Sequence, residues 1–303
     1  MLDFNHIPYN STAMDYQLFT STANNWVTWS KPRGAKWVYT LAVGSGASGQ
    51  NGANGAATNA GGQGGGSGSM CVAMIPAFMI PDTLFIRAGA GGVQTSTASG
   101  AAQVSGGLDT RVSFQPASAN ASTLCYASGA VGATGGVVPV IQGLTTMVRG
   151  SVNYVAGHTA PTVAGAIPSA MPTTGIFVLG GAFGGGTGAQ GSYYTPTISQ
   201  LDTKAWLHFF SPSVDNGFPG GTLGVGPGDG ARGTNGNLGA IPFFFHRGAG
   251  GGGGGGNGGG SGGNGGNAVL GGGGGGGGAA GNTTTSVGIG GGGGDGFVVI
   301  STW

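Results

Sequence analysis

The amino-acid sequence predicts an all-β protein: an antiparallel β-sandwich or jelly-roll-like fold with glycine-rich loops, some of them packed as polyglycine II helices. Glycine provides 75 of the 303 residues, whereas charged residues make up only 6%. Apolar residues occur in short runs rich in β-branched and aromatic side chains and bounded by glycine and proline, which is typical of strands. No segment has the apolar spacing of an amphipathic helix, and AWLHFF at 205–210 is too short to be one.

Six strands are predicted in chain order. KWVYTLAV at 36–43 is the strongest of them, because it combines β-branched and aromatic residues in one run. MCVAMI at 70–75 and DTLFIRAG at 82–89 are expected to pair with each other through a turn that begins at Pro76 and ends at Pro81. The remaining strands are TRVSF at 110–114, TLCYAS at 123–128 and the closing strand GFVVISTW at 296–303.

Changes in composition divide the chain into four regions. Residues 1–30 are polar and aromatic and poor in glycine, and they are predicted to be an N-terminal attachment arm. Residues 31–128 form the first part of a glycine-rich β domain, and residues 248–303 hold a polyglycine region and the closing strand of that domain. Between them, residues 129–247 are interpreted as a loop-rich insertion with aromatic clusters.

The densest glycine tract lies at residues 248–294, which contain 30 glycines in 47 positions and no charge. Ordering a glycine costs about 0.5–1 kcal/mol more than ordering an alanine, and no side-chain core offsets that cost here. Extended helices with three residues per turn point their N–H and C=O groups outward, so neighbouring helices without Cβ atoms can hydrogen-bond to one another. We therefore expect the runs at 250–256 and 271–278 to be ordered and bonded to neighbouring glycine segments. Tight glycine turns between strands are the alternative.

Composition also excludes several functional classes. The nine Lys and Arg residues are dispersed and give no basic stripe, so nucleic-acid binding is not expected. No apolar run approaches the ~20 residues of a membrane span, and the first residues lack the basic start and apolar stretch of a signal peptide. Cys71 and Cys125 belong to no CxxC motif and are interpreted as two buried free thiols.

Two short motifs match catalytic signatures only through the abundance of glycine. GSGASG at 44–49 has GxGxxG spacing after a strand, but it lacks the following helix and the acidic residue about 20 positions later that a dinucleotide site requires. GGSGG at 259–263 has the GxSxG pattern of a nucleophile elbow without its strand-to-helix context. No catalytic residue, cofactor or metal site is therefore predicted. The four histidines also lack metal-ligand spacing: His6, His158, His208 and His246.

Aromatic clusters in the insertion are the candidate binding feature. Aromatic ring faces bury large areas in carbohydrate and protein recognition. In a chain with few large side chains, the same residues are also needed for a core or a subunit interface, and both interpretations stay open. The candidates for receptor or interface contacts are Tyr193, Tyr194, Trp206, His208, Phe209, Phe243, Phe244 and Phe245.

Four stretches of the sequence resemble one family, in that family's order. TWSKPRGAKWVYTLAVGSGASG at 28–49 is similar to the opening of glycine-rich domains in bacteriophage virion and tail-fibre proteins, where a tryptophan, a Pro-x-Gly turn and a hydrophobic strand lead into a glycine tract. DTLFIRAGAGG at 82–92, LDTRVSF at 108–114 and GGGGGDGFVVISTW at 290–303 are similar to the later strands of that family. Residues 129–247 have no counterpart in it. In composition alone, the long glycine runs also resemble phage adhesins in which polyglycine helices form a sandwich.

The resemblance implies a non-enzymatic virion structural protein, a tail-fibre or adhesin-type component involved in host attachment. A capsid decoration or head-fibre protein is the alternative, and an extracellular glycine-rich scaffold is the third hypothesis. The implied partners are other virion proteins of the capsid or tail and a host cell-surface receptor or glycan. A homo-oligomer, with a trimer as the first expectation, follows from the symmetric assembly of phage fibres. The resemblance brings no catalytic residue and no cofactor.

Overall fold

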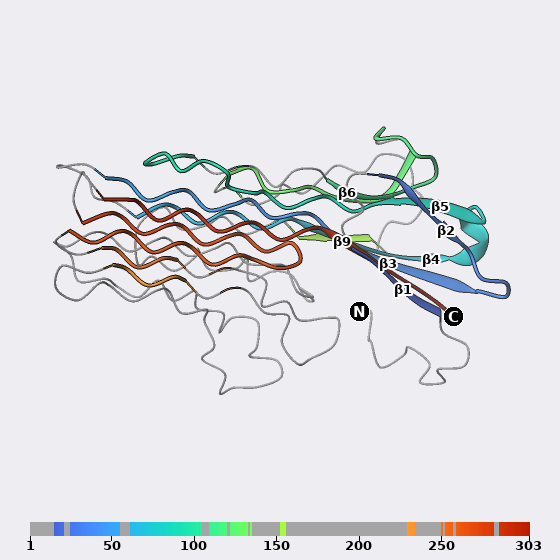
Figure 1. Cartoon of the computed structure of the whole chain (residues 1–303). Coiled ribbons are helices and arrows are strands. Elements are labelled where there is room, and N and C mark those ends of the chain that lie inside the picture. Colours follow the sequence, from blue (N-terminus) through green and yellow to red (C-terminus); the bar gives the residue numbers. More distant parts are fainter. Residues whose placement is uncertain are drawn as a thin grey trace, which may run out of the picture.

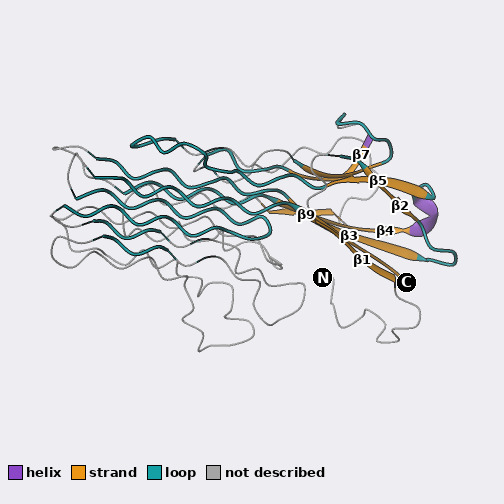
Figure 2. Ribbon diagram, viewed as in Figure 1, coloured by secondary structure: helices purple, strands orange, loops and turns teal. Residues whose placement is uncertain are grey.

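The fold is all-β, with two antiparallel sheets. A computed structural model of the chain describes residues 15–20, 25–54, 61–102, 104, 109–119, 122–132, 134, 152–155, 229–233, 235, 250, 252–256, 259–281 and 285–303. The two sheets and the C-terminus lie at one end of the molecule, and long glycine-rich segments extend away from them side by side (Figures 1 and 2). The fold class predicted from the sequence is therefore confirmed at the level of an all-β chain with two antiparallel sheets.

The larger sheet has five strands in the order β1-β9-β3-β4-β8. Its C-terminal strand β9 lies between β1 and β3 and is antiparallel to both, so that Thr302 stands opposite Asp15 on one side and Val38 on the other. The last strand is thus internal to the sheet. The bounds of the five strands are β1 (Asp15–Thr20), β9 (Phe297–Thr302), β3 (Trp37–Val43), β4 (Met70–Pro76) and β8 (Val152–Val155).

The smaller sheet has four strands in the order β2-β5-β6-β7. All neighbouring pairs are antiparallel, and the pairing of β6 with β7 contains a register shift between Val112 and Ser113. β5 alternates buried and partly buried residues, as expected where one face of a strand meets the core, whereas all four residues of β6 are buried. Their bounds are β2 (Val27–Ser30), β5 (Thr83–Arg87), β6 (Thr110–Ser113) and β7 (Thr123–Ala127).

The six predicted strands are all present, but the predicted pairing of 70–75 with 82–89 is wrong. β4 pairs with β3 and β8 in the larger sheet, whereas β5 pairs with β2 and β6 in the smaller one. The chain crosses between the sheets through the 3-10 turn η2 (Ala77–Met79). Lys31 fixes this crossover, because its Nζ donates to the carbonyl oxygens of Ala77 (3.0 Å) and Ile80 (2.9 Å) and pairs with Asp82 (3.0 Å).

Regions expected to lie outside the β domain contribute strands to both sheets. The described part of residues 1–30 includes β1, which pairs with β9, and β2, which pairs with β5. The described part of residues 129–247 includes β8, which forms an edge of the larger sheet by pairing with β4. AWLHFF at 205–210 lies outside the described residues.

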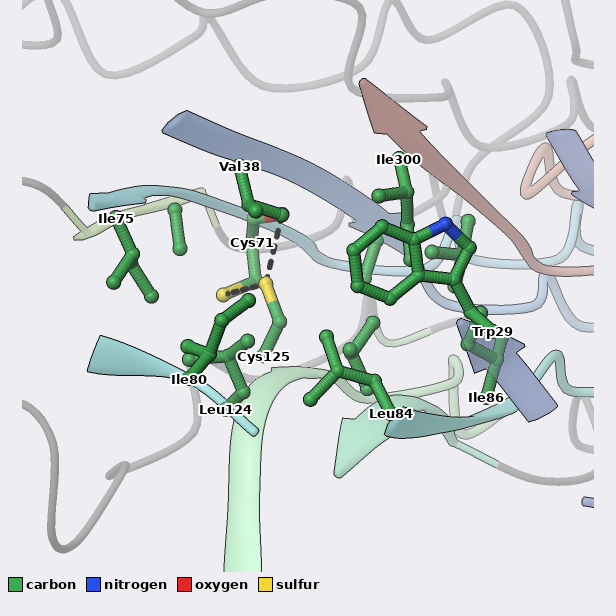
Figure 3. Packing of buried hydrophobic residues seen from close by; sticks show 14 of the residues in the cluster. Trp29, Val38, Cys71, Ile75, Ile80, Leu84, Ile86, Leu124, Cys125 and Ile300 are labelled. Carbon is green, nitrogen blue, oxygen red and sulfur yellow. Dashed lines mark hydrogen bonds between the residues drawn. The ribbon is translucent and has the colours of Figure 1, made fainter. Parts of the chain in front are cut away.

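The main hydrophobic core contains side chains from both sheets (Figure 3). Trp29 from β2 is 1% exposed and packs in the same cluster as Ile300 from β9 and Leu84 from β5. A second buried cluster includes Tyr39, Leu41 and Val299, with the partly buried Leu270 packed against it. β3 is therefore buried along nearly its whole length, which explains its continuous apolar sequence.

No helix among the residues that the structure describes has the length and apolar character needed to cross a membrane.

Candidate functional site

The most distinctive feature beyond the sheets is a group of extended glycine-rich segments, here called the glycine bundle (Figure 1). Its described residues form no β-ladder with one another and are held by single backbone hydrogen bonds. Most of them are buried although they contribute few large side chains. The bundle comprises the described residues of 44–52, 61–69, 88–104, 229–235, 250–256, 259–268, 271–281 and 285–296.

The hydrogen bonds between bundle segments recur at every third residue. The residues of 44–52 fall into three sets, each made of residues three positions apart. The N–H groups of the first set donate to 61–69, those of the second donate to 285–296, and those of the third donate to the segment around 101–104. Three consecutive residues thus face three different neighbours, and the pattern then repeats. The first set is Gly44, Ala47 and Gln50, which donate to Ser69, Gly66 and Gln63; the second is Gly46, Gly49 and Gly52, which donate to Gly294, Gly291 and Gly288; the third includes Ser48 and Asn51, which donate to Val104 and Ala101.

The two glycine runs singled out in the sequence follow the same rule. In the run at 250–256, Gly250, Gly253 and Gly256 donate to Gly273, Gly276 and Ala279, so this segment runs parallel to 271–281. In the run at 271–278, Gly274 and Gly277 donate to Ala47 and Gln50, and Gly275 and Gly278 donate to Gly266 and Gly263. The expectation that these runs bond to neighbouring glycine segments is therefore confirmed for their described residues.

Glycine is required in the bundle because backbones touch where a side chain would begin. An ideal Cβ at Gly46 would lie 1.8 Å from the carbonyl oxygen of Gly272, and one at Gly49 would lie 2.0 Å from that of Gly275. At Gly52, three residues further on, the corresponding oxygen is that of Gly278, also at 2.0 Å. Along 46–52 these positions thus repeat with the same period of three as the hydrogen bonds. Within 271–281, a Cβ at each of the consecutive residues Gly276, Gly277 and Gly278 would collide with a neighbouring backbone.

The two motifs that match catalytic signatures are packing elements of the bundle. In GSGASG at 44–49, a Cβ at any of the three signature glycines would collide with the backbone of another segment. In GGSGG at 259–263, Ser261 lies in an extended segment, where its N–H donates to Asp229 Oδ1 at 2.6 Å and its carbonyl accepts from Gly230. A Cβ at Gly262 or Gly263 of this motif would likewise collide with a neighbouring backbone.

Asparagine and aspartate side chains replace backbone carbonyls at several places in the bundle. Asn51 is buried, and its Oδ1 accepts the N–H of Gly290 at 3.0 Å while its Nδ2 donates to Ser96 and Ala98. Asp295 Oδ1 accepts the N–H of Gly91 at 2.7 Å. The sequence analysis did not predict these hydrogen bonds, although one signal was visible: Ser261, Asn264 and Asn267 are spaced by three. Asn264 and Asn267 accept the N–H groups of Ile289 and Gly292 through their Oδ1 atoms.

The main charged cluster lies on the smaller sheet. Arg87 and Arg111 stand directly opposite each other on β5 and β6, a placement that repulsion alone disfavours. Arg111 pairs with Asp109 at 3.2 Å and lies 4.2 Å from the ring centroid of Tyr126. The pKa of Arg87 is lowered mainly by desolvation and to a smaller extent by repulsion from the positive charge of Arg111. Both guanidinium groups also donate to Ser118, so the cluster fastens the 114–119 segment to the sheet.

The predicted contact residues lie outside the described residues, so the structure brings none of them together: Tyr193, Tyr194, Trp206, His208, Phe209, Phe243, Phe244 and Phe245. Cys71 and Cys125 are both buried and free, as expected. Within the described residues, no group of three His, Cys, Asp or Glu side chains is placed to hold a metal ion.

No family model matches the chain, and no curated protein matches it.

Proposed function

We propose that the protein is a non-enzymatic structural component of a bacteriophage virion, of the tail-fibre or adhesin type, with a role in host attachment. The observation that carries this proposal is the glycine bundle, in which backbone hydrogen bonds at every third residue hold the extended segments together. Such a bundle is a scaffold rather than a catalytic centre, and scaffolds of this kind suit the presentation of loops to a partner. The resemblance of residues 28–49 and 290–303 to phage glycine-rich domains points the same way.

In this proposal the bundle segments are polyglycine II helices, and the two sheets form a jelly-roll-like sandwich. The period of three in the hydrogen bonds, and in the excluded Cβ positions of Gly46, Gly49 and Gly52, supports the helices, because polyglycine II has three residues per turn. The core shared by the two sheets supports the sandwich. In a crystal structure we expect φ near −75° and ψ near +145° along 44–52 and 271–281. Dihedral angles of β-strands or of turns at these residues would reject the helices.

The sheets and the N-terminal arm attach the protein to the particle, and the opposite end of the bundle faces outward. The described residues 94–99 at that end carry no charge and are polar except for Ala98, and Thr95, Thr97 and Ser99 are exposed. The aromatic candidates of residues 193–245 serve either the receptor contact or the interface of a homo-oligomer, which we propose to be a trimer. The molar mass in solution tests the oligomer: three times 29.0 kDa is expected by light scattering, and a monomer would refute it.

The decisive experiment is immunogold electron microscopy of intact phage particles that carry this protein, with an antibody against the chain. Label at tail fibres or the tail tip is expected. Particles without label would overturn the assignment to the virion, provided that the antibody detects the purified chain. Incubation with host polysaccharide is the companion experiment, because detectable hydrolysis would refute a non-enzymatic role.

A capsid decoration or head-fibre protein is the second candidate. It is favoured by one observation, namely that the sequence has neither coiled-coil heptads nor a repeated rod that would make a long shaft. Gold label distributed over the capsid would select this candidate. The stability of particles with and without the protein would then be the next measurement.

A further inference from the structure

The two cysteines of the chain face each other across the core between the sheets (Figure 3). Cys71 lies on β4 of the larger sheet and Cys125 lies on β7 of the smaller one. Both are fully buried in the main hydrophobic cluster, among apolar neighbours such as Leu124 and Ile75. A covalent bond between them would therefore join β4 of the larger sheet to β7 at an edge of the smaller one.

The distance between the two sulfur atoms is 2.7 Å. Unbonded carbon atoms, which are smaller than sulfur, reach their best separation at about 3.5–4.0 Å, so the thiols lie well inside ordinary contact. A bond length of about 2.05 Å would be reached by a relative shift of about 0.65 Å. The separation also argues against a metal between them, because two thiolates on a tetrahedral zinc ion at about 2.3 Å would lie roughly 3.8 Å apart.

We propose that Cys71 and Cys125 are an oxidisable pair that forms one disulfide within the chain and ties the two sheets together. The oxidant is a small-molecule disulfide such as oxidised glutathione. One cysteine thiolate attacks it, forms a mixed disulfide and releases one glutathione thiolate. The second cysteine thiolate then attacks the protein sulfur of the mixed disulfide and releases the other glutathione. Two thiol protons are lost to solvent or to the leaving thiolates, and the oxidant takes up both electrons.

Burial makes this oxidation depend on opening of the sheets. Glutathione has no path to two fully buried sulfurs, so the first attack takes place while β4 and β7 are apart. Burial and the hydrogen bond with Cys125 also raise the pKa of Cys71 well above its ordinary value, which keeps this thiol protonated in the closed protein. As the sheets move back together, the second sulfur approaches the first, attacks the mixed disulfide and expels glutathione before the core closes. The reduced pair is therefore long-lived, and the disulfide, once formed, is protected.

The test uses the full chain, reduced and then incubated with oxidised glutathione in a series of guanidinium chloride concentrations below the unfolding midpoint. Each sample is quenched with N-ethylmaleimide under denaturing conditions and analysed by intact mass and peptide mapping. We expect the number of alkylated thiols per oxidised chain to decrease from two to none and the chain itself to lose the mass of two hydrogens. Peptide mapping should yield a Cys71–Cys125 cross-linked peptide. The rate should rise with denaturant, and the oxidised chain should unfold at a higher guanidinium chloride midpoint than the reduced chain.

Single variants provide the matched control. In Cys71→Ser and Cys125→Ser the remaining thiol should keep its glutathione, because it has no partner with which to complete the exchange. The wild-type mass measurement does not depend on these variants, so it stands even if one of them fails to fold. The proposal is overturned if wild-type chains keep two alkylatable thiols, if they accumulate the glutathione adduct, or if they form disulfides only between chains.

Discussion

The carbonyl oxygen of Gly266 occupies the place of a side chain at Gly291: an ideal Cβ on Gly291 would lie 1.9 Å from it. One residue further on, Gly292 has ordinary space, since its nearest neighbour is the carbonyl oxygen of Gly92 at 3.5 Å. Two adjacent glycines of one segment therefore differ in whether glycine is required. This contrast makes the packing of the bundle testable with very small changes.

Gly291→Ala should lower the free energy of unfolding by about 1–3 kcal/mol or more, because two backbones must separate to admit the methyl group. Gly292→Ala should leave stability within about 1 kcal/mol of wild type, or raise it slightly by restricting the unfolded chain. Denaturant midpoints of the two variants measure the difference. Equal midpoints would contradict the close contact at Gly291.

The buried side chain of Asn51 joins residues far apart in the sequence. Asn51→Ala should cost about 1–3 kcal/mol, because the N–H of Gly290 and the carbonyls of Ser96 and Ala98 lose their side-chain partner. Asn54→Ala, three residues away and half-buried, should change stability by about 0.5 kcal/mol or less. Unfolding in urea compares the two, and a larger cost at Asn54 would show that the position of Asn51 is not special.

Lys31 is expected to stabilise the crossover between the sheets mainly through its bonds to backbone carbonyls. Lys31→Met should lower the free energy of unfolding by about 1–3 kcal/mol, because the carbonyls of Ala77 and Ile80 lose a charged donor. Asp82→Asn removes only the ion pair with a carboxylate that is 92% exposed, so a loss of about 0–1 kcal/mol is expected. Thermal unfolding of both variants compares their losses of stability. A greater loss in Asp82→Asn than in Lys31→Met would show that the ion pair, and not the bonds to backbone carbonyls, is the main contribution of Lys31.

Stability should fall in alkaline solution. Burial, followed by the nearby Cys125 and Tyr16, raises the pKa of Tyr39, and burial raises the pKa of Cys71. In the unfolded chain these groups lose their protons near pH 10 and 8.5, while the folded chain still holds them. Their contribution is therefore complete below pH 8.5 and declines as the pH rises, by about 1.4 kcal/mol per pH unit for each group that only the unfolded chain has deprotonated.

Guanidinium chloride midpoints of the reduced protein from pH 7 to pH 11 measure this decline. In Tyr39→Phe, the guanidinium chloride midpoint should decline less steeply above pH 10 than it does in the wild type. A constant midpoint to pH 11 would show that neither group keeps its proton in the folded chain.

Strands were predictable because each is a short run of β-branched and aromatic residues with glycine or proline beside it, as at Trp37–Val43. Their partners were not predictable, because the sequence between β4 and β5 is short enough for a hairpin, whereas β4 pairs with β3 and β8 and β5 pairs with β2 and β6. The bonds of Lys31 to Ala77 and Ile80, which hold the crossover, have no recognisable pattern in the sequence. The hydrogen bonding of the glycine runs could be predicted from the missing Cβ atoms. The bridging of Asn51 to Gly290 could not, since it depends on a register between segments 239 positions apart.

The bundle also determines how the stability of the protein depends on temperature. Its unfolding exposes peptide N–H and C=O groups in a larger proportion than the unfolding of a side-chain core does. Exposed apolar surface raises the heat capacity of the unfolded state, whereas exposed polar surface lowers it. The heat-capacity change of unfolding should therefore be smaller per residue than the about 12–15 cal/mol/K of ordinary domains. A flatter stability curve follows, so the protein should lose little stability on cooling.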